Sequence, residues 1–269
     1  PSARRALLRQ VRRAIPHDYA VRVPGPGDLR AGFVPLPGQG PVRTHLVEDD
    51  DVAAWWPPRG AAAHKWQSAT WVVGGSAGMS GALALAGAGA QRLGAGYVRL
   101  STPGGHVVTG PHLPVEAVGV ALPGTGWSTT VLAEQGRFGA LVVGNGLGAE
   151  VEHRNDLRAV VAGAVVPCVV DADGITLLGT QAAEVVQPHT VLTPHDGEFA
   201  RLVRHGPGPD RIDAVRRLAD SIGCVVLLKG PLTVVASPDG RELCPDSGDA
   251  RLATAGTGDV LAGMIGAAC

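Results

Sequence analysis

The sequence predicts an α/β fold with a mostly parallel central sheet. From Ala69 onward, short apolar runs that end in glycine or polar residues alternate with helical patterns. The runs are continuously apolar, which indicates strands buried on both faces. Strands that alternate with helices indicate parallel pairing through right-handed crossovers. The 269 residues, 45% of them hydrophobic, are enough for one large domain of this class.

The predicted elements follow one another in a regular order. A short helix is expected at DDVAAWW, and a helix of small residues at SGALALAGAGAQRLG ends at a glycine. Further helices are expected at 151–163, 198–203 and 210–223, and LTVVASPDGRELC is typical of a hairpin that turns at 238–240. Buried strands are expected in ATWVVGGS, YVRLST, ALVVGNG, CVVDADG, TVLTPHDGE and CVVLLKG.

The two ends of the chain differ from this pattern. Residues 1–40 combine an arginine-rich stretch with the Pro- and Gly-rich VPGPGDLRAGFVPLPGQG, which is typical of a tail or linker. Residues 41–269 are expected to form the folded domain. Its last helix starts near Asp259 and the sequence stops at Cys269, so we expect the domain to be truncated at its C-terminus.

Composition argues against several classes of partner. The formal net charge of −1 gives no general attraction to nucleic acid or to an anionic membrane surface. No window of about 18 consecutive apolar residues occurs, so no membrane span is expected. The four cysteines stand apart in apolar segments without a CxxC pair, which indicates reduced core thiols and a cytoplasmic location. No histidine pair has metal-ligand spacing, so we expect no metal site built by the protein itself.

Polar and glycine residues gather where the predicted strands end. In open α/β sheets, ligands bind beyond the carboxyl ends of the strands. One polar strand end carries little information, but five of them in one chain favour a ligand cleft. These ends are Gly74-Gly75-Ser76, Asn145-Gly146, Asp171-Ala172-Asp173, Thr193-Pro194-His195 and Lys229-Gly230.

The stretch TAGTGDVLAG places a glycine turn and one acid at the start of the last helix. Glycines let a phosphate approach the unpaired N–H groups of a helix start, which carry partial positive charge. Asp259 could be an ordinary helix N-cap. It could also accept the proton of an attacking hydroxyl while Gly256 and Gly258 form an anion hole, a pair that suits phosphoryl transfer. The pattern matches neither the Walker A motif nor GxGxxG.

Two further strand ends carry candidate ligand groups. Lys229 follows a buried strand and is either a surface lysine or a cation for a nucleotide phosphate, with Gly230 and Thr233 shaping the contact. His195 opens a helix, where a neutral imidazole can both donate to and accept from a polar ligand. Asp196 and Glu198 in the same first turn are interpreted as partners of the helix dipole.

Six motifs occur in an order that resembles a known family. They are GGSAGMSGA, VVGNGLG, VVDADGITLL, VLTPHDGEFARL, LKGPLTVV and ATAGTGDVLAG. Over roughly residues 41–269 the chain is similar to the ATP- or ADP-dependent NAD(P)H-hydrate dehydratases of the ribokinase-like superfamily. The resemblance implies a three-layer α/β/α sandwich and an enzyme that repairs hydrated nicotinamide cofactors. Such an enzyme phosphorylates the ring hydroxyl of the S epimer with ADP or ATP and Mg²⁺, and loss of phosphate restores NADH or NADPH.

The resemblance also implies roles for individual residues. Asp259 would be the catalytic base, with Gly256 and Gly258 at the anion hole. The hydrated nicotinamide nucleotide would contact Ala82, Gly146, Gly148, His195 and Asp259. The adenine nucleotide would contact Lys229, Gly230, Pro231, Leu232, Thr233, Thr257 and Gly258, and Mg²⁺ would be held mainly by phosphates and water. A homo-oligomer and a fused or separate epimerase domain are further implied partners.

This sequence departs from the family pattern at several positions. Met79 stands where an aromatic residue is common, and Asn145 replaces the proline of a GPG motif, which makes it a candidate extra donor. Two other functions stay open at this point. A kinase for a small alcohol would share the fold and leave a stable phosphate ester. A non-catalytic nucleotide-binding module would need the glycine turn but no base.

Overall fold

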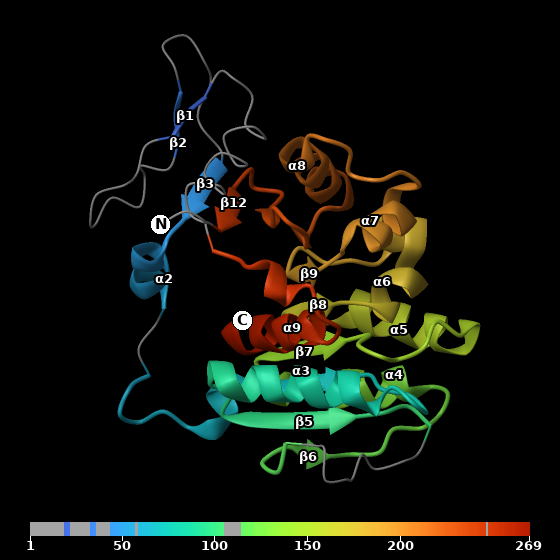
Figure 1. Ribbon diagram of the computed structural model, residues 1–269. Coiled ribbons are helices and arrows are strands. Elements are labelled where there is room, and N and C mark those ends of the chain that lie inside the picture. The colour runs from blue at the N-terminus through green and yellow to red at the C-terminus, as the bar shows by residue number, and fades with distance from the viewer. Residues whose placement is uncertain (1–18, 22–32, 36–43, 57–58, 105–113, 246) are drawn as a thin grey trace.

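The computed structural model describes residues 19–21, 33–35, 44–56, 59–104, 114–245 and 247–269. The described residues of the domain form one large sheet (Figure 1). Its strands are β3 (Thr44–Val47), β4 (Ala69–Val73), β5 (Tyr97–Ser101), β6 (Val118–Gly119), β7 (Ala140–Val143), β8 (Cys168–Val170), β9 (Thr190–Leu192), β10 (Val225–Leu228), β11 (Val234–Ala236) and β12 (Glu242–Pro245).

The order of the strands in this sheet is β3-β12-β11-β10-β9-β8-β7-β4-β5-β6. Strand β11 runs antiparallel to both of its neighbours, as the predicted hairpin requires. The other pairs are parallel, which confirms the predicted mostly parallel sheet. From β4 the chain builds outward through β5 and β6, and it then returns to the other side of β4 with β7. The carboxyl ends of β4 and β7 therefore flank the point where the strand order reverses, which is where open α/β sheets bind ligands.

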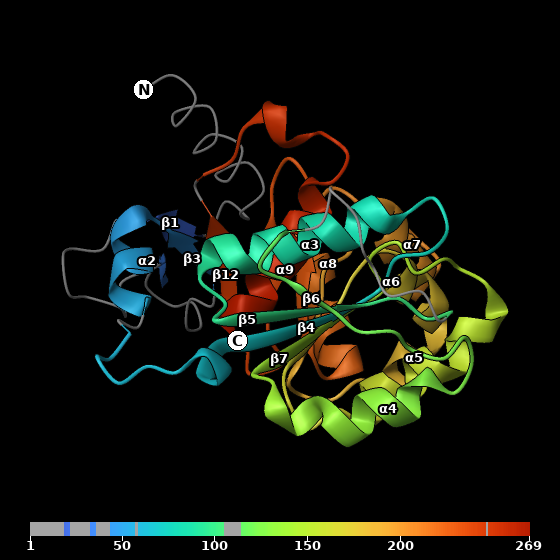
Figure 2. The same cartoon turned by 90° about the horizontal axis from the view of Figure 1, so that it is seen from below.

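Helices cover both faces of the sheet and make three layers (Figure 2). Alternate residues of each strand serve opposite faces, so Val72 packs in one core with Leu83 while Trp71 and Val73 pack in the other with Trp127. One face carries α3 (Ser80–Leu93) and α9 (Thr257–Ala268). The other face carries α4 (Trp127–Glu134), α5 (Val151–Gly163), α6 (Asp173–Leu178), α7 (Asp196–Val203) and α8 (Arg211–Ile222).

Glycines let α3 and α9 lie side by side at short range (Figures 1 and 2). A Cβ atom added to Gly89 of α3 would lie 2.3 Å from the carbonyl oxygen of Val260. A Cβ atom added to Gly263 of α9 would lie 1.8 Å from the carbonyl oxygen of Ala86. Neither position can hold a side chain at this spacing. The small-residue composition of both helices therefore fixes the position of α9, whose first turn carries Asp259.

Most predicted element boundaries agree with the structure, and the exceptions have local causes. Helix α7 begins at Asp196, two residues before the predicted start, because His195 caps it. Helix α9 begins at Thr257, also two residues early, because Gly256 takes the N-cap position in a left-handed conformation. The sequence patterns missed β3, β6, α4 and α6 and found the short helix α2 (Asp49–Trp55). The described residues also form four 3₁₀ helices: η1 (Lys65–Ser68), η2 (Gln135–Arg137), η3 (Gly179–Glu184) and η4 (Ala250–Leu252).

The predicted tail or linker over residues 1–40 lies largely outside the described residues. The described part consists of β1 (Tyr19–Val21) and β2 (Phe33–Pro35), which pair antiparallel. In the described parts of the chain, no helix combines the length and the apolar character that crossing a membrane would require. Three of the four cysteines are buried free thiols as expected, whereas Cys269 is exposed.

Candidate active site

A buried carboxylate organises the polar residues at the strand ends. Asp171 follows β8 and is 1% exposed. It accepts hydrogen bonds from the hydroxyl of Thr193 at 2.8 Å, from Nζ of Lys229 at 2.6 Å and from Nδ2 of Asn145 at 3.0 Å. These three partners follow β9, β10 and β7, so the adjacent parallel strands deliver them to one place. A buried ion pair is tolerated when such additional hydrogen bonds satisfy it.

Asp259 lies beside this cluster, on the first turn of α9. Its Oδ1 accepts a hydrogen bond of 2.8 Å from Nδ2 of Asn145. The structure therefore removes the N-cap alternative, because Gly256 occupies the cap and Asp259 comes three residues later. Burial raises the pKa of Asp259, and the negative charges of Asp171 and Asp173 raise it further, while the hydrogen bond from Asn145 and the charge of Lys229 oppose this. A carboxylate with a raised pKa in such a position is suited to accepting a proton.

The start of α9 presents free backbone donors next to a cation. The N–H groups of Gly256, Gly258 and Asp259 make no hydrogen bond to any other described residue. A Cβ atom on Gly258 would lie 3.4 Å from Nζ of Lys229, so the ammonium group borders this turn. Thr257 uses its hydroxyl to donate to the carbonyl groups of Leu252 and Thr254, which holds the turn together. Donors and a cation arranged in this way can hold an anion.

Arg211 of α8 supports the loop after β10 through hydrogen bonds. Its Nη2 donates to the carbonyl oxygen of Lys229 at 2.9 Å, and its Nε donates to that of Leu232 at 3.2 Å. Its Nη1 contacts both carboxylate oxygens of Asp196, at 2.7 and 2.9 Å. Gly230 has no room for a side chain, because an added Cβ would lie 2.5 Å from Nη2 of Arg211. One guanidinium thus joins the Lys229 loop to the first turn of α7.

His195 caps α7 with its side chain. Its Nδ1 accepts from the N–H groups of Gly197 at 2.9 Å and Glu198 at 3.2 Å, so Nε2 carries the proton of the neutral ring. The side chain is 55% exposed, and its Nε2 lies 3.4 Å from Oε1 of Glu198, so a ligand would compete with that carboxylate for its proton. Glu198 accepts from the backbone N–H of His195 and lies 3.6 Å from Nζ of Lys229. It is therefore more than the dipole partner that the sequence indicated, because it links His195 to the lysine.

Of the residues predicted to contact the nicotinamide nucleotide, Gly146 and Gly148 lie in the loop after β7, Ala82 lies against it, and His195 caps α7 instead. Gly146 has a φ of +63°, and an added Cβ would lie 2.9 Å from that of Ala82. The N–H group of Gly148 donates to Asp173 at 2.9 Å. Gly146 therefore lies against Ala82 at the switch point of the sheet, whereas Gly148 of the same loop contacts α6.

The structure differs from the expectations for Lys229 and Leu232. It also adds roles for two residues that the sequence did not single out. Lys229 is not an ordinary surface lysine, since its side chain is 19% exposed and paired. Leu232 is 6% exposed and packs in the core, so its side chain is directed away from any ligand. Asp171 was noticed only as a polar strand end, and nothing in the sequence marked Arg211. Helix α8 starts at Arg211, eighteen residues before Lys229, so no local pattern signals a contact between them.

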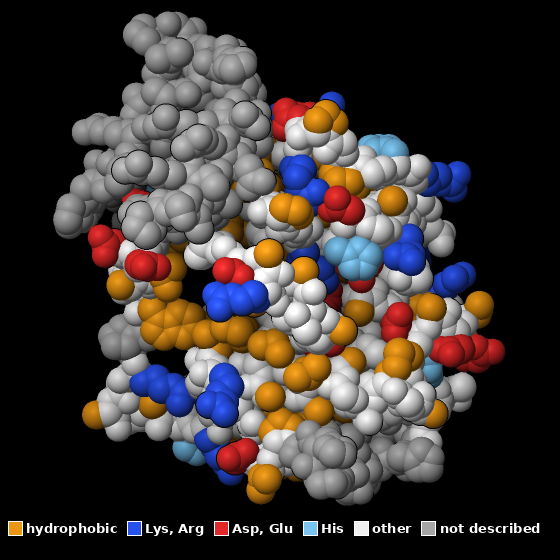
Figure 3. Space-filling model, in the orientation of Figure 1, with side chains coloured by type: hydrophobic (Ala, Val, Ile, Leu, Met, Phe, Trp, Pro, Cys, Tyr) orange, Lys and Arg blue, Asp and Glu red, His pale blue; other side chains and the backbone are white. Residues whose placement is uncertain are grey.

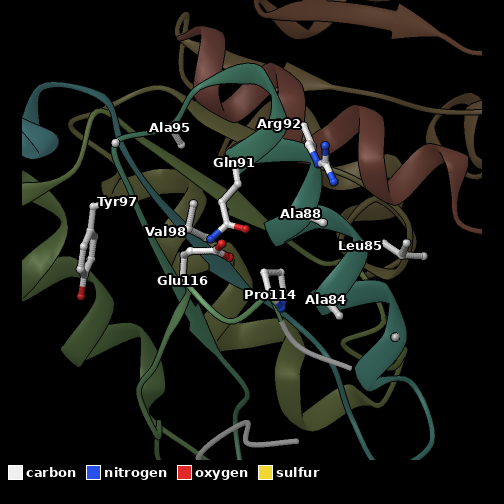
Figure 4. Close-up of a pocket in the computed structure, with 12 residues that line it drawn as sticks. Ala84, Leu85, Ala88, Gln91, Arg92, Ala95, Tyr97, Val98, Pro114 and Glu116 are labelled. Carbon is white, nitrogen blue, oxygen red and sulfur yellow. The ribbon is translucent and has the colours of Figure 1, made fainter. Parts of the chain in front are cut away.

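Two surface hollows lie away from this cluster. A hollow of about 800 Å³ on the outer side of α3 is lined by Leu85, Gln91 and Arg92 and faces Tyr97 and Glu116 (Figure 4). A second, of about 740 Å³, lies between Trp55, Trp56 and the end of α9. Hydrophobic side chains gather on the surface between α2 and α9 (Figure 3). Neither hollow contains a predicted site residue, and neither has the charged groups of the strand-end cluster, so we place the chemistry at the cluster.

The described residues contain no group of three or more His, Cys, Asp or Glu side chains arranged to hold a metal ion.

Comparison with known proteins relates this arrangement to a family. A family model described as NAD(P)H-hydrate dehydratase matches residues 70–268. The bifunctional NAD(P)H-hydrate repair enzyme of Mycobacterium tuberculosis is 41% identical over 223 residues, which cover 82% of this chain and 45% of that protein. This chain thus spans slightly less than half the length of that relative. The ADP-dependent (S)-NAD(P)H-hydrate dehydratase of Neisseria meningitidis is 39% identical, with 72% of this chain and 67% of that protein covered.

Solved structures agree on the fold. A ribokinase-like superfamily protein from Enterococcus faecalis aligns with a TM-score of 0.73 at 23% identity, covering 83% of this chain and 79% of that one. The ADP/ATP-dependent NAD(P)H-hydrate dehydratase of Bacillus subtilis, co-crystallized with ATP/Mg²⁺, aligns with a TM-score of 0.67 at 29% identity, covering 82% and 79%. The predicted ribokinase-like three-layer fold is confirmed.

Proposed function

Because the chain belongs to the NAD(P)H-hydrate dehydratase family, we propose that it restores NADH or NADPH from the S epimer of the hydrated cofactor. The phosphoryl donor is ADP or ATP with Mg²⁺. The observation that carries the proposal is the position of Asp259. A partly buried carboxylate with a raised pKa lies on the same helix turn as free N–H donors, and Lys229 borders that turn.

The chemistry assigned to the site has two steps. In the first, Asp259 accepts the proton of the ring hydroxyl as that oxygen attacks the terminal phosphorus, and AMP or ADP leaves. The N–H groups of Gly256 and Gly258 and the ammonium of Lys229 stabilise the charge that develops on the phosphoryl oxygens. In the second, the ring nitrogen supplies an electron pair, the carbon–oxygen bond to phosphate breaks, and a proton leaves the neighbouring ring carbon. Phosphate is a far better leaving group than hydroxide, which is why the hydroxyl is first phosphorylated.

The remaining residues bind and orient the two nucleotides. Gly230, Pro231, Thr233 and Thr257 border the site of the adenine nucleotide, and Leu232 shapes its loop from the core. Ala82, Gly146, Gly148 and His195 border the hydrated nicotinamide, to which Nε2 of His195 donates. When bound, Mg²⁺ would neutralise phosphate charge, and it would be held mainly by the phosphates and water.

The test is a spectrophotometric assay of hydrated NADH with ADP or ATP and Mg²⁺. We expect recovery of the reduced nicotinamide absorbance together with release of inorganic phosphate. Asp259→Asn should lower kcat by about 100-fold or more, since a positioned base contributes this much, and should leave ADP binding unchanged. A stable phosphate ester would instead indicate a small-alcohol kinase. Equal ADP binding by both proteins without any turnover would indicate a non-catalytic nucleotide-binding module.

We also propose the surroundings of this activity. Residues 41–269 act as the catalytic unit and residues 1–40 as a linker, in agreement with a sheet that starts at β3. The bifunctional relatives support an epimerase partner, fused or separate. The enzyme works as a homo-oligomer in the cytoplasm, and its three buried free thiols fit a reducing compartment. Its net charge of −1 gives no general attraction to nucleic acid or to an anionic membrane surface.

A further inference from the structure

We propose that Asn145 is a positioning residue for Asp259, whose side-chain amide holds the carboxylate of the base and the carboxylate of Asp171 in one fixed arrangement. The inference deepens the proposed function, because it rests on Asp259 acting as the base. Asn145 follows β7 at the switch point of the sheet and is fully buried.

The amide spans two carboxylates that belong to different parts of the fold. Its Nδ2 donates to Oδ1 of Asp259 at 2.8 Å and to Oδ2 of Asp171 at 3.0 Å. Both of its N–H bonds are therefore used, which is all that an amide nitrogen can donate. The bond to Asp259 is a direct side-chain contact between α9 and the rigid centre of the sheet.

Chemistry fixes the orientation of this amide. An amide oxygen that faced two carboxylate oxygens would be repelled by both, so the nitrogen must face them. The Oδ1 atom is then left buried, without a partner among the described residues. Leaving this buried oxygen without a hydrogen bond costs free energy. Such a placement indicates that the contacts to the two carboxylates determine where the amide lies.

The surroundings of Asp259 make this hydrogen bond important for its protonation. The titratable groups that face it are Asp171 after β8, Asp173 on α6 and Lys229 after β10. From α3, the uncharged side chain of Leu85 packs on Gly256 of this turn. Two carboxylates oppose ionisation of Asp259 and one ammonium favours it, so the amide of Asn145 is the neutral donor that keeps the ionised form in place.

The backbone reinforces this arrangement. The carbonyl oxygen of Asn145 accepts a 2.8 Å hydrogen bond from the N–H of Gly75, at the end of β4. Gly74 must lack a side chain there, because an added Cβ would lie 2.3 Å from the same oxygen. Asn145 is therefore fixed by its backbone before its side chain reaches Asp259.

The experiment compares Asn145→Ala and Asn145→Leu with a matched buried amide elsewhere. Leucine fills a similar volume without a donor and serves if the alanine variant fails to fold. The control is Gln135→Ala, since Gln135 is also a buried amide, which donates to Gly163 and accepts from Val165 on the other face of the sheet. Two readouts are needed: the pH profile of kcat/KM, and the titration of the Asp259 carboxyl carbon by ¹³C NMR, assigned through its loss in Asp259→Asn.

Without the amide, we expect the Asp259 titration and the acidic limb of kcat/KM to move together to higher pH, because the hydrogen bond from Asn145 lowers the pKa of Asp259. We expect kcat to fall roughly tenfold because the base loses its positioning contact. The Kd for ADP should stay the same, because Asp171 keeps its bonds to Thr193 and Lys229 and so still holds the lysine in place. Gln135→Ala should show neither change. An unchanged Asp259 titration in the alanine and leucine variants would overturn the inference. A shifted titration in a protein that never dehydrates hydrated NADH would support the inference about Asn145 and overturn only the proposed dehydration.

Discussion

At the scale of single residues, Asp259 joins function to stability. Burial raises its pKa in the folded protein above that in the unfolded chain. A group of this kind contributes stability that is fully present below the unfolded pKa and is lost as the pH rises through the folded pKa. The ionised form that the proposed reaction needs is therefore the form that the fold favours less. Active sites commonly carry such an opposition between stability and activity.

The substitution Asp259→Asn should therefore raise the melting temperature relative to the parent protein, and the difference should grow as the pH increases. Asparagine keeps an oxygen that can accept from Nδ2 of Asn145 but never ionises, so it avoids the cost of a buried charge. At about pH 4, near the ordinary pKa of aspartate, we expect the variant and the parent protein to melt at similar temperatures. At about pH 8 we expect the variant to melt roughly 2–4 °C higher. Calorimetric scans at several pH values measure the difference.

Asp239 supplies a control of opposite sign. Its hydrogen bond from the Arg241 side chain lowers its pKa to about 2, and it is an exposed residue of the hairpin turn. Its contribution to stability is present above the unfolded pKa and lost as the pH falls toward 2, and exposure keeps it small. Asp239→Asn should therefore leave the melting temperature nearly unchanged or slightly lower at about pH 8. A rise equal to that of Asp259→Asn would contradict the explanation by burial.

At the scale of elements, the loop after β10 depends on a helix outside the site. Arg211 of α8 donates to two carbonyl groups of this loop and pairs with Asp196 of α7. Lysine cannot reproduce this planar fork of donors. We expect Arg211→Lys to raise the KM for ADP about tenfold with little change in kcat, because the loop and Lys229 lose their support.

Arg217→Lys is the matched control on the same helix. Arg217 is 75% exposed and pairs only with Asp213 among the described residues. Its substitution should leave both kinetic constants and the melting temperature unchanged. If Arg211→Lys lowered kcat and left the KM for ADP as it was, the arginine would not act through the nucleotide loop.

At the scale of the whole molecule, regular patterns predicted more than single contacts did. The buried strands and the helix at 151–163 were predictable because their periodicity is local. Strands β3 and β6 were missed because they are short and lie at the edges of the sheet. In the site, Asp259 was recognisable from its motif, whereas the role of Asp171 depends on partners up to 58 positions away in sequence. Such contacts arise from strand order, which no local pattern encodes.

The close packing of α3 and α9 gives the last prediction. Gly263→Ala would place a methyl group 1.8 Å from the carbonyl oxygen of Ala86, so the two helices must move apart. Overpacking of this kind costs about 1–3 kcal/mol, and we expect a melting temperature lower by roughly 3–10 °C. Because Asp259 lies one turn earlier on α9, kcat should fall as well.

Gly81→Ala on α3 is the control for stability, since nothing lies within 4 Å of its added Cβ. It should leave the melting temperature unchanged or raise it slightly, because alanine favours helix over glycine. A Gly263→Ala protein that melts within about 1 °C of the parent would show that the two helices do not pack at this distance.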